Sequence, residues 1–178
     1  MTKRECSNCS LCCRLLPVKE FQKPAGVRCN HQRHVGCNIY ARRPMSCALW
    51  SCRWLTNDDT ADMSRPDRAH YVLDPMPDFV TLVDNATGKE TNIEVVQVWC
   101  DVRFPDAHKD PDLRAYLERR GHEGKAAIIR YSELHAFTLF PPSITGDTWR
   151  EFHGGTVKPE RTPEERFAGI AKARMIGG

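Results

Sequence analysis

The sequence predicts an α+β protein, in which a small irregular cysteine-rich metal-binding module at the N-terminus packs on a small mixed unit of strands and helices. Three observations lead to this prediction. Eight of the nine cysteines lie between positions 6 and 52. Beyond them, apolar residues recur in short runs with strand and helix periods. The polar stretch "RWLTNDDTADMSRPDR" connects the two parts, which predicts domains at 1–56 and 57–178.

The N-terminal cysteines are spaced as metal ligands. A Cys-x2-Cys-x2-Cys run is followed at once by another Cys, and four more cysteines follow; the predicted ligands are Cys6, Cys9, Cys12, Cys13, Cys29, Cys37, Cys47 and Cys52. Two-residue spacing lets two sulfurs bind one ion. The three-thiol run is typical of bacterial ferredoxins, whereas four cysteines are a usual structural zinc site. We therefore expect an iron–sulfur cluster, which the ferredoxin-like run favours, or zinc.

Other interpretations of the cysteines fit less well. A disulfide framework requires an oxidising compartment, and "MTKRECSNC" lacks the apolar stretch of a secretion signal, so we expect a cytoplasmic protein without a membrane span.

The neighbours Cys12 and Cys13 point apart in an extended loop. The eight thiols could therefore form either one metal centre with spare sulfurs or two centres of four thiolates each. Either His31 or His34 could replace a thiolate, although a polar loop is the simpler interpretation.

The stretch "GCNIYARRPMSCALWSCRWL" adds a second motif to the Cys6–Cys13 run. Together they resemble the CxxCxxCC family, the YkgJ-type cysteine-cluster or zinc- or iron-chelating domain, over residues 5–55. The matching positions beside the cysteines are Ile39, Tyr40, Arg43 and Pro44, while Ser10 stands in a loop where members often carry Gly. The resemblance implies zinc or iron binding and no definite reaction.

The residues between these cysteines have expected supporting roles. We expect Tyr40 and Trp50 to cover the metal and keep water off it, and Arg43 to donate hydrogen bonds to a sulfur or to a carbonyl. Pro44 biases Arg43 toward an extended backbone, which could direct Cys47 toward Cys37.

Charge is distributed unevenly along the chain. Residues 1–56 carry a formal charge of +8 and residues 57–178 carry −5, for a net charge of +3. Thiolates on a metal add negative charge that this count omits, and nearby arginines would offset part of it: Arg14, Arg28, Arg42, Arg43 and Arg53. A nucleic-acid contact is the other interpretation of such asymmetry. It is disfavoured because residues 1–56 show no interleaving of aromatic and basic residues and no recognition helix.

Residues 57–178 predict alternating strands and helices. "AHYVLD" predicts a short strand that ends before Pro75, and residues 79–83 and 92–100 predict a hairpin whose turn contains Asn85 and Gly88. The apolar run "IEVVQVWC" ends at Cys100, which we expect to be a buried core thiol rather than a ligand.

The remaining elements are predicted from residues that cap helices and from Gly and Pro residues that end helices and strands. Asp110 and Pro111 predict a helix that stops at Gly121, "KAAIIRYSE" and "HAFTLFPP" predict two further strands, and residues 162–165 predict a capping box that opens a C-terminal helix.

No catalytic residue is predicted. The candidates in this half are His108, His122, Glu123, His135, His153, Asp101 and Asp106, and we expect the histidines to lie at the surface. The expected function is a metal-binding cysteine-cluster protein with a redox or structural role and an unidentified protein partner or substrate. A metal-dependent protein-modifying enzyme and a zinc-type nucleic-acid-binding module are the alternatives.

Overall fold

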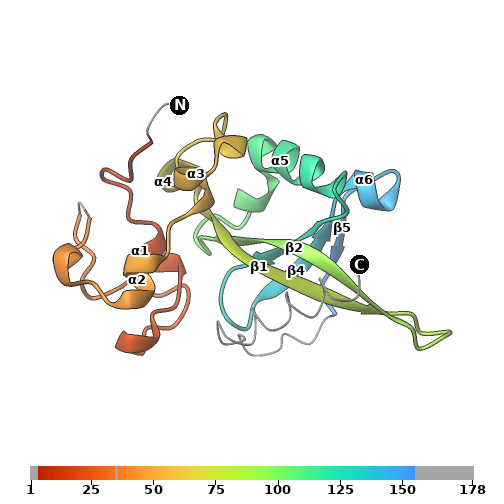
Figure 1. The fold of residues 1–178 in the computed structure, drawn as a ribbon, viewed down its shortest axis with the longest axis horizontal. Helices are drawn as coiled ribbons and strands as arrows, with labels where there is room; N and C mark the ends of the chain where they lie inside the picture. The colour runs from red at the N-terminus through yellow and green to blue at the C-terminus, as the bar shows by residue number, and fades with distance from the viewer. Residues whose placement is uncertain (1–3, 35, 155–178) are drawn as a thin grey trace, which may run out of the picture.

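The computed structural model describes residues 4–34 and 36–154. A twisted mixed sheet forms one half of the described chain, and the cysteine-rich segment forms the other half beside one end of the sheet (Figure 1). The α+β class predicted from the sequence is confirmed.

The sheet has the strand order β1-β2-β3-β4-β5. The first two strands form a long antiparallel hairpin, the third is parallel to the second, and the last two continue antiparallel. Their bounds are β1 Tyr71–Val83, β2 Glu90–Cys100, β3 Ala126–Arg130, β4 Ala136–Phe140 and β5 Arg150–Phe152.

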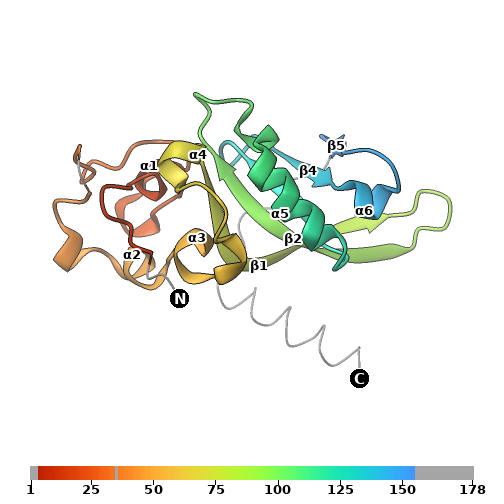
Figure 2. The same cartoon turned by 90° about the horizontal axis from the view of Figure 1, so that it is seen from above.

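The longest helix, α5 (Pro111–Gly121), connects the parallel strands β2 and β3 and lies across one face of the sheet (Figure 2). A parallel pair requires such a crossover connection. The other α-helices are short: α1 Cys12–Leu15, α2 Met45–Leu49, α3 Arg53–Thr56, α4 Pro66–Ala69 and α6 Pro142–Thr145. Four single 3-10 turns complete the described chain: η1 Lys19–Phe21, η2 Tyr40–Arg42, η3 Asp58–Thr60 and η4 Ala107–Lys109.

The main core lies between α5 and the sheet. Leu113, Tyr116 and Leu117 recur at the helical spacing on α5 and are fully buried against alternate residues of the strands, among them Val98 and Ile129. The predicted helix is confirmed, and Asp110 caps it by accepting a hydrogen bond from the Leu113 amide at 3.0 Å.

A second apolar cluster covers the opposite face of β1 and β2 at the end nearest the cysteines. Val72 and Trp99 point to this face because they alternate with the residues of the main core. The cysteine-rich segment covers them with the buried residues Leu11, Leu15, Ala25 and Cys52. Burial on both faces explains why β2 ends in six consecutive buried residues, all apolar except Gln97, instead of an alternation of buried and exposed ones.

Asp74 connects the two halves by hydrogen bonds. Its carboxylate accepts from the indole of Trp50 at 3.1 Å and from the indole of Trp99 at 3.3 Å. The strand register shifts directly after it, between Asp74 and Asp78. The predicted break before Pro75 is therefore wrong. The chain passes through both prolines as one strand, because an irregularity at this point removes the need for regular ladder hydrogen bonds.

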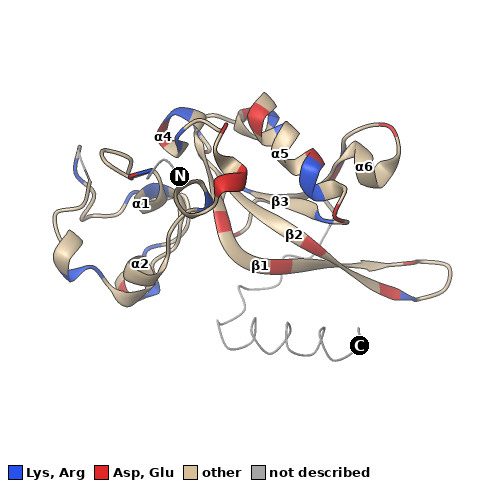
Figure 3. Ribbon diagram, turned by 45° about the horizontal axis from the view of Figure 1, so that its top comes forward, with Lys and Arg blue, Asp and Glu red and all other residues tan. Residues whose placement is uncertain are grey.

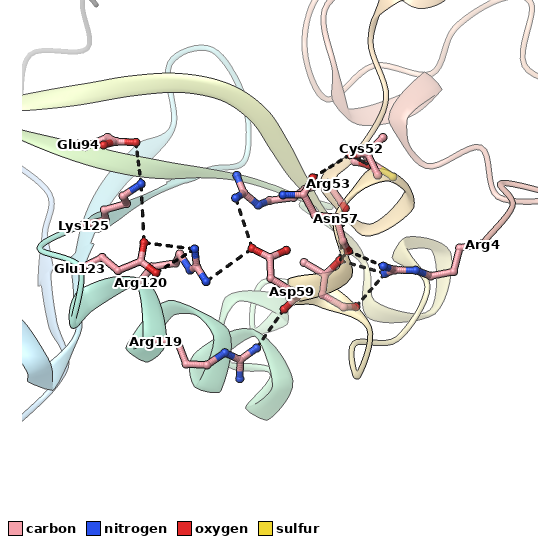
Figure 4. A network of polar contacts seen from close by, with 12 residues as sticks. Arg4, Cys52, Arg53, Asn57, Asp59, Glu94, Arg119, Arg120, Glu123 and Lys125 are labelled. Atoms are coloured by element: carbon pink, nitrogen blue, oxygen red, sulfur yellow. Dashed lines mark hydrogen bonds and ion pairs between the residues drawn. The ribbon is translucent and has the colours of Figure 1, made fainter. Parts of the chain in front are cut away.

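The polar connector packs against both halves. Asp59 pairs with Arg53 at 3.4 Å and with Arg120 of α5 at 3.6 Å, and Arg119 donates to the Asp59 carbonyl at 3.2 Å (Figure 4). Arg4 donates to Thr60 and to the Asn57 carbonyl. The segment therefore forms specific contacts rather than a free linker between the predicted domains 1–56 and 57–178.

The other predicted elements of residues 57–178 are largely confirmed. The hairpin forms with Gly88 at a φ of 69° in its turn, and the two later strands are β3 and β4. Strand β5 was not predicted, since three exposed residues leave no apolar pattern. The predicted C-terminal helix lies outside the described residues. In the described chain no helix is long and apolar enough to cross a membrane.

We expect Leu15→Ala to lower the free energy of unfolding by about 2–5 kcal/mol, because Leu15 is only 2% exposed in the second cluster and its truncation leaves a cavity. Leu49→Ala is the matched control, since that side chain is 79% exposed. Chemical unfolding followed by tryptophan fluorescence measures both. Equal losses in the two variants would contradict the packing of the cysteine-rich segment on the sheet.

Candidate metal centre

The cysteine-rich segment has little regular structure and a small apolar core. Its helices have four or five residues, and its loops are held by single turns and by two isolated bridges, Val18 with Lys23 and Gln32 with Cys37. Helix α1 is positioned by Leu11 and Leu15, which are one turn apart and buried against the sheet. This packing fixes the position of Cys12 and Cys13 at the start of the helix.

All nine cysteines are free thiols. In residues 4–34 and 36–154, no three side chains of His, Cys, Asp or Glu converge as a group able to hold a metal ion. Several of the predicted ligands are nevertheless close enough for their charges to interact, and the eight thiols differ in their surroundings.

We call Cys6, Cys9, Cys12 and Cys52 the sheet-side thiols. Cys52 is buried in the second apolar cluster, and Cys9 packs against that cluster. Burial raises the pKa of the Cys52 thiol to about 11, and the charges of Cys6 and Cys9 act in the same direction. Burial also raises the pKa of Cys9, although the amides of Leu11 and Asp67 donate hydrogen bonds to its sulfur. Such amide donors favour the thiolate that a metal requires.

We call Cys13, Cys29, Cys37 and Cys47 the loop-side thiols. The Cys29 amide donates to the Cys13 carbonyl at 2.9 Å, and Cys47 is close enough for the charges of Cys13 and Cys29 to raise its pKa, in addition to the larger effect of its burial. The Gln32 amide donates to the Cys29 carbonyl at 3.0 Å, and Gln32 forms an isolated bridge with Cys37. The Gln32 side chain attaches this loop to Ser10.

The two sets meet at the adjacent residues Cys12 and Cys13. The Cys12 thiol donates a hydrogen bond to Cys13, which lowers the pKa of Cys13 to about 7 and raises that of Cys12 well above its ordinary value. Cys6 also lies close enough to Cys13 for their charges to interact. The sequence predicted that these two neighbours point apart in an extended loop, and this prediction is wrong. The two residues lie in the helical turn α1, and their sulfurs are in hydrogen-bonding contact.

A buried lysine that the sequence analysis missed lies among the loop-side thiols. Lys23 is 8% exposed, and its ammonium donates to the carbonyls of Arg14, Leu16 and Pro24. Burial lowers its pKa, while the charges of nearby thiols raise it, led by Cys29. The sequence offered no signal for it beyond a basic residue in a cysteine-rich segment, because three carbonyls from separate positions create its site.

The cations that lie nearest the sulfurs differ in part from those expected. Burial raises the pKa of Cys6 against the opposing charges of Arg65 and Arg43. Arg53 instead pairs with Asp59, and Arg28 donates to the Gln32 carbonyl. Figure 3 shows how Lys and Arg predominate over Asp and Glu along the ribbon of the cysteine-rich segment.

The expected covering residues take other roles. Tyr40 is 62% exposed, with the Arg43 guanidinium stacked over its ring. Arg43 donates to the carbonyls of Tyr40 and Cys47, which fits the expected hydrogen bond to a carbonyl. Its extended backbone before Pro44 is also as predicted. Trp50 packs on the second apolar cluster and donates to Asp74, so it anchors the segment to the sheet.

The histidines divide between the surface and one buried position. His34, His122, His135 and His153 are exposed as expected, and His31 is half-buried against the ring of Phe21. His108 is buried, so its expected surface position is wrong. The turn η4 places it against the rings of Tyr131 and Phe137, where its Nδ1 lies 2.7 Å from the Tyr131 hydroxyl. Burial lowers its pKa.

The other candidates in this half have structural contacts. Asp101 is buried and pairs with Arg103, Asp106 pairs with Lys109, and Glu123 pairs with Arg120 and Lys125. Cys100 is buried as predicted, which raises the pKa of its thiol to about 12.

Comparison of the chain with protein-family models, with curated proteins and with solved structures gave no significant match. The donor chemistry itself fits a thiolate-bound metal. Eight free thiols lie in one segment with a small apolar core, and backbone amides donate hydrogen bonds to the sulfurs of Cys9, Cys13 and Cys52. The ligand geometry is not formed among the described residues.

We expect Lys23→Met to lower the free energy of unfolding by about 1–3 kcal/mol, because it leaves three carbonyls in a buried site without their donor. Lys19→Met is the matched control on an exposed position of the adjacent turn. Urea unfolding of both variants gives the comparison. If Lys23→Met were as stable as Lys19→Met, the buried ammonium would have no structural role.

Proposed function

We propose that this chain is a metal-binding cysteine-cluster protein whose N-terminal thiolates hold an iron–sulfur cluster, in a redox or structural role. The observation that carries the proposal is the gathering of free thiols from distant parts of the chain. Cys52 lies close enough to Cys6 and Cys9 for their charges to interact, and Cys47 lies close enough to Cys13 and Cys29, although more than thirty positions separate Cys47 and Cys52 from the first run.

The sheet-side thiols support iron–sulfur over zinc. Three of them come from the Cys-x2-Cys-x2-Cys run, and the fourth, Cys52, comes from elsewhere in the chain, which is the ligand pattern of bacterial ferredoxins. An iron–sulfur cluster bound there supplies one-electron redox chemistry. The chain's own contribution is to present the sulfurs, to donate amide hydrogen bonds to Cys9 and Cys52, and to exclude water from Cys52 by burial.

Metal binding also accounts for how such a small core keeps its fold. Among the described residues of 1–56, the buried apolar side chains are Leu11, Leu15, Val18, Ala25 and Cys52. Small domains with few buried apolar residues commonly use metals for stability, and the free energy of binding then contributes to folding. The metal is therefore expected to stabilise the cysteine-rich segment as well as to provide any redox chemistry.

The test is the content of iron, zinc and acid-labile sulfide in protein purified without oxygen, with a visible absorption spectrum. We expect a brown protein with iron and sulfide in near-equal amounts. A colourless protein with zinc would replace the iron–sulfur assignment by a structural zinc site. Protein without metal, with its thiols paired as disulfides, would overturn the proposal.

Substitution of single cysteines provides the residue-level test. We expect Cys9→Ser and Cys47→Ser to reduce the metal content and the stability of the cysteine-rich segment, because each removes a ligand. Cys100→Ser is the matched control and should keep the wild-type metal content, since Cys100 is buried in the main core beside Tyr131. Loss of metal in Cys100→Ser but not in Cys9→Ser would show that the ligand assignment is wrong.

A further inference from the structure

The sheet has an apolar face that lies outside both apolar clusters of the described chain. Helices α5 and α6 lie on one side of the sheet (Figure 1), and the cysteine-rich segment covers the other side at the end that carries Val72 and Trp99. Beyond this end, the face away from α5 presents apolar side chains from four strands. We call it the far face, and its apolar residues include Val80, Leu82, Ile93, Val95, Ile128 and Phe140. None of these six belongs to either cluster.

The strand register places these residues on one face. Val96 and Val98 of β2 face α5, so Val95 between them points to the far face. Ile93 lies two positions before Val95 and pairs with Val80 of β1. Because paired residues of neighbouring strands share a face, the registers of β3 and β4 continue the far face across the sheet.

The outer part of the β1–β2 hairpin shows the same difference between the two faces. This part extends past α5 (Figure 2). On the side of α5, Thr81 and Glu94 are polar and exposed. On the far face, Val80, Leu82 and Ile93 are apolar and half-buried. An apolar face of this kind needs a covering layer, because a two-stranded ribbon alone is only marginally stable in water.

A buried amide on the far face lacks a partner. Gln97 is 1% exposed, and its Oε1 accepts a hydrogen bond from Nε of Arg130 at 3.1 Å. Its Nε2 is buried and has no hydrogen-bond acceptor in the part of the chain that the structure describes. A buried donor without an acceptor is costly. The covering layer is therefore expected to be polypeptide, which can supply a carbonyl as well as apolar side chains.

The chain itself contains a segment with this chemistry. The described residues end at Gly154, directly after β5, and residues 155–178 follow. The sequence predicts a capping box at 162–165 that opens a helix, with Phe167, Ile170 and Ala171 at helical spacing on one side. An amphipathic helix of this kind can cover the free face of a sheet.

The position of β5 allows this segment to reach every strand. β5 is the edge strand opposite β1, and five strands at a spacing of about 4.8 Å span about 19 Å. Residues 154–161 reach roughly 26 Å when extended, at about 3.3 Å per residue. The side of α5 is already filled by the main core, so the far face is the one available to a helix that follows β5.

We propose that residues 155–178 dock on the far face through the apolar side of their predicted helix. The sheet is then covered by α5 on one face and by this segment on the other, and the segment supplies the acceptor for Gln97. This interaction lies in residues 57–178 and does not depend on the metal proposed for the cysteine-rich segment.

The test compares how fast trypsin cleaves after Lys172 in the full chain and in a synthetic peptide of residues 155–178. Docking slows this cleavage, because trypsin acts on the small population in which the segment is released. We expect cleavage in the full chain to be slower by a factor of about ten or more. Equal rates in the full chain and in the peptide would overturn the proposal.

Variants of the full chain assign the protection to the far face. Ile128→Ser and Ile93→Ser each replace an apolar side chain of this face, and we expect both to raise the cleavage rate toward that of the peptide. Val83→Ser is the matched control, since Val83 is 54% exposed on the other face of the same hairpin, and it should keep the slow rate. Slow cleavage in both far-face variants, or fast cleavage in Val83→Ser, would contradict the proposal.

Two further measurements complete the test. Circular dichroism shows whether each variant retains its sheet, and Ile93→Ser decides the outcome if Ile128→Ser does not fold. Sedimentation velocity gives the oligomeric state of the wild-type chain. A monomer with slow cleavage supports docking within one chain. A dimer that loses the protection of Lys172 on dilution would assign the covering layer to a second copy and overturn the proposal.

Discussion

Burial of both faces at one end of the β1–β2 pair is the constraint on which the rest of the structure depends. One face packs under α5, and the other, through Val72 and Trp99, requires a cover that the cysteine-rich segment provides. Asp74 fixes the alignment, because its carboxylate accepts from one indole on each side of the boundary. Without this cover two large apolar side chains would be exposed to water, and the segment would lose the surface that orients α1 and Cys52.

The position of the thiols follows from this packing. Leu11 and Leu15 place α1 on the sheet, and this packing fixes the position of Cys12 and Cys13 on the helix. Cys52 lies in the same apolar cluster and so comes beside the first cysteine run. The apolar contacts therefore position the backbone that carries these thiols, and a bound metal would still have to draw the sulfurs together.

Charge near the sulfurs depends on position rather than on composition. Residues 1–56 carry a formal charge of +8, yet Arg53 is paired with a carboxylate, and Arg4 also lies within 3.9 Å of one. The cation most enclosed by thiols is Lys23, which is also the most buried cation of the described segment. Three carbonyls hold this buried ammonium in a fixed position, and charges interact more strongly in such a site than at the surface.

The sequence by itself determined what depends on near neighbours along the chain. Short apolar runs bounded by turn residues and prolines determined the hairpin, β3 and β4. The Asp110–Pro111 cap determined the start of α5, and the Cys spacing indicated the thiolate chemistry. The tertiary structure decided what depends on distant residues. It made one strand through Pro75, buried His108 and enclosed Lys23. Each of these results from contacts between segments far apart in the chain, which no local pattern records.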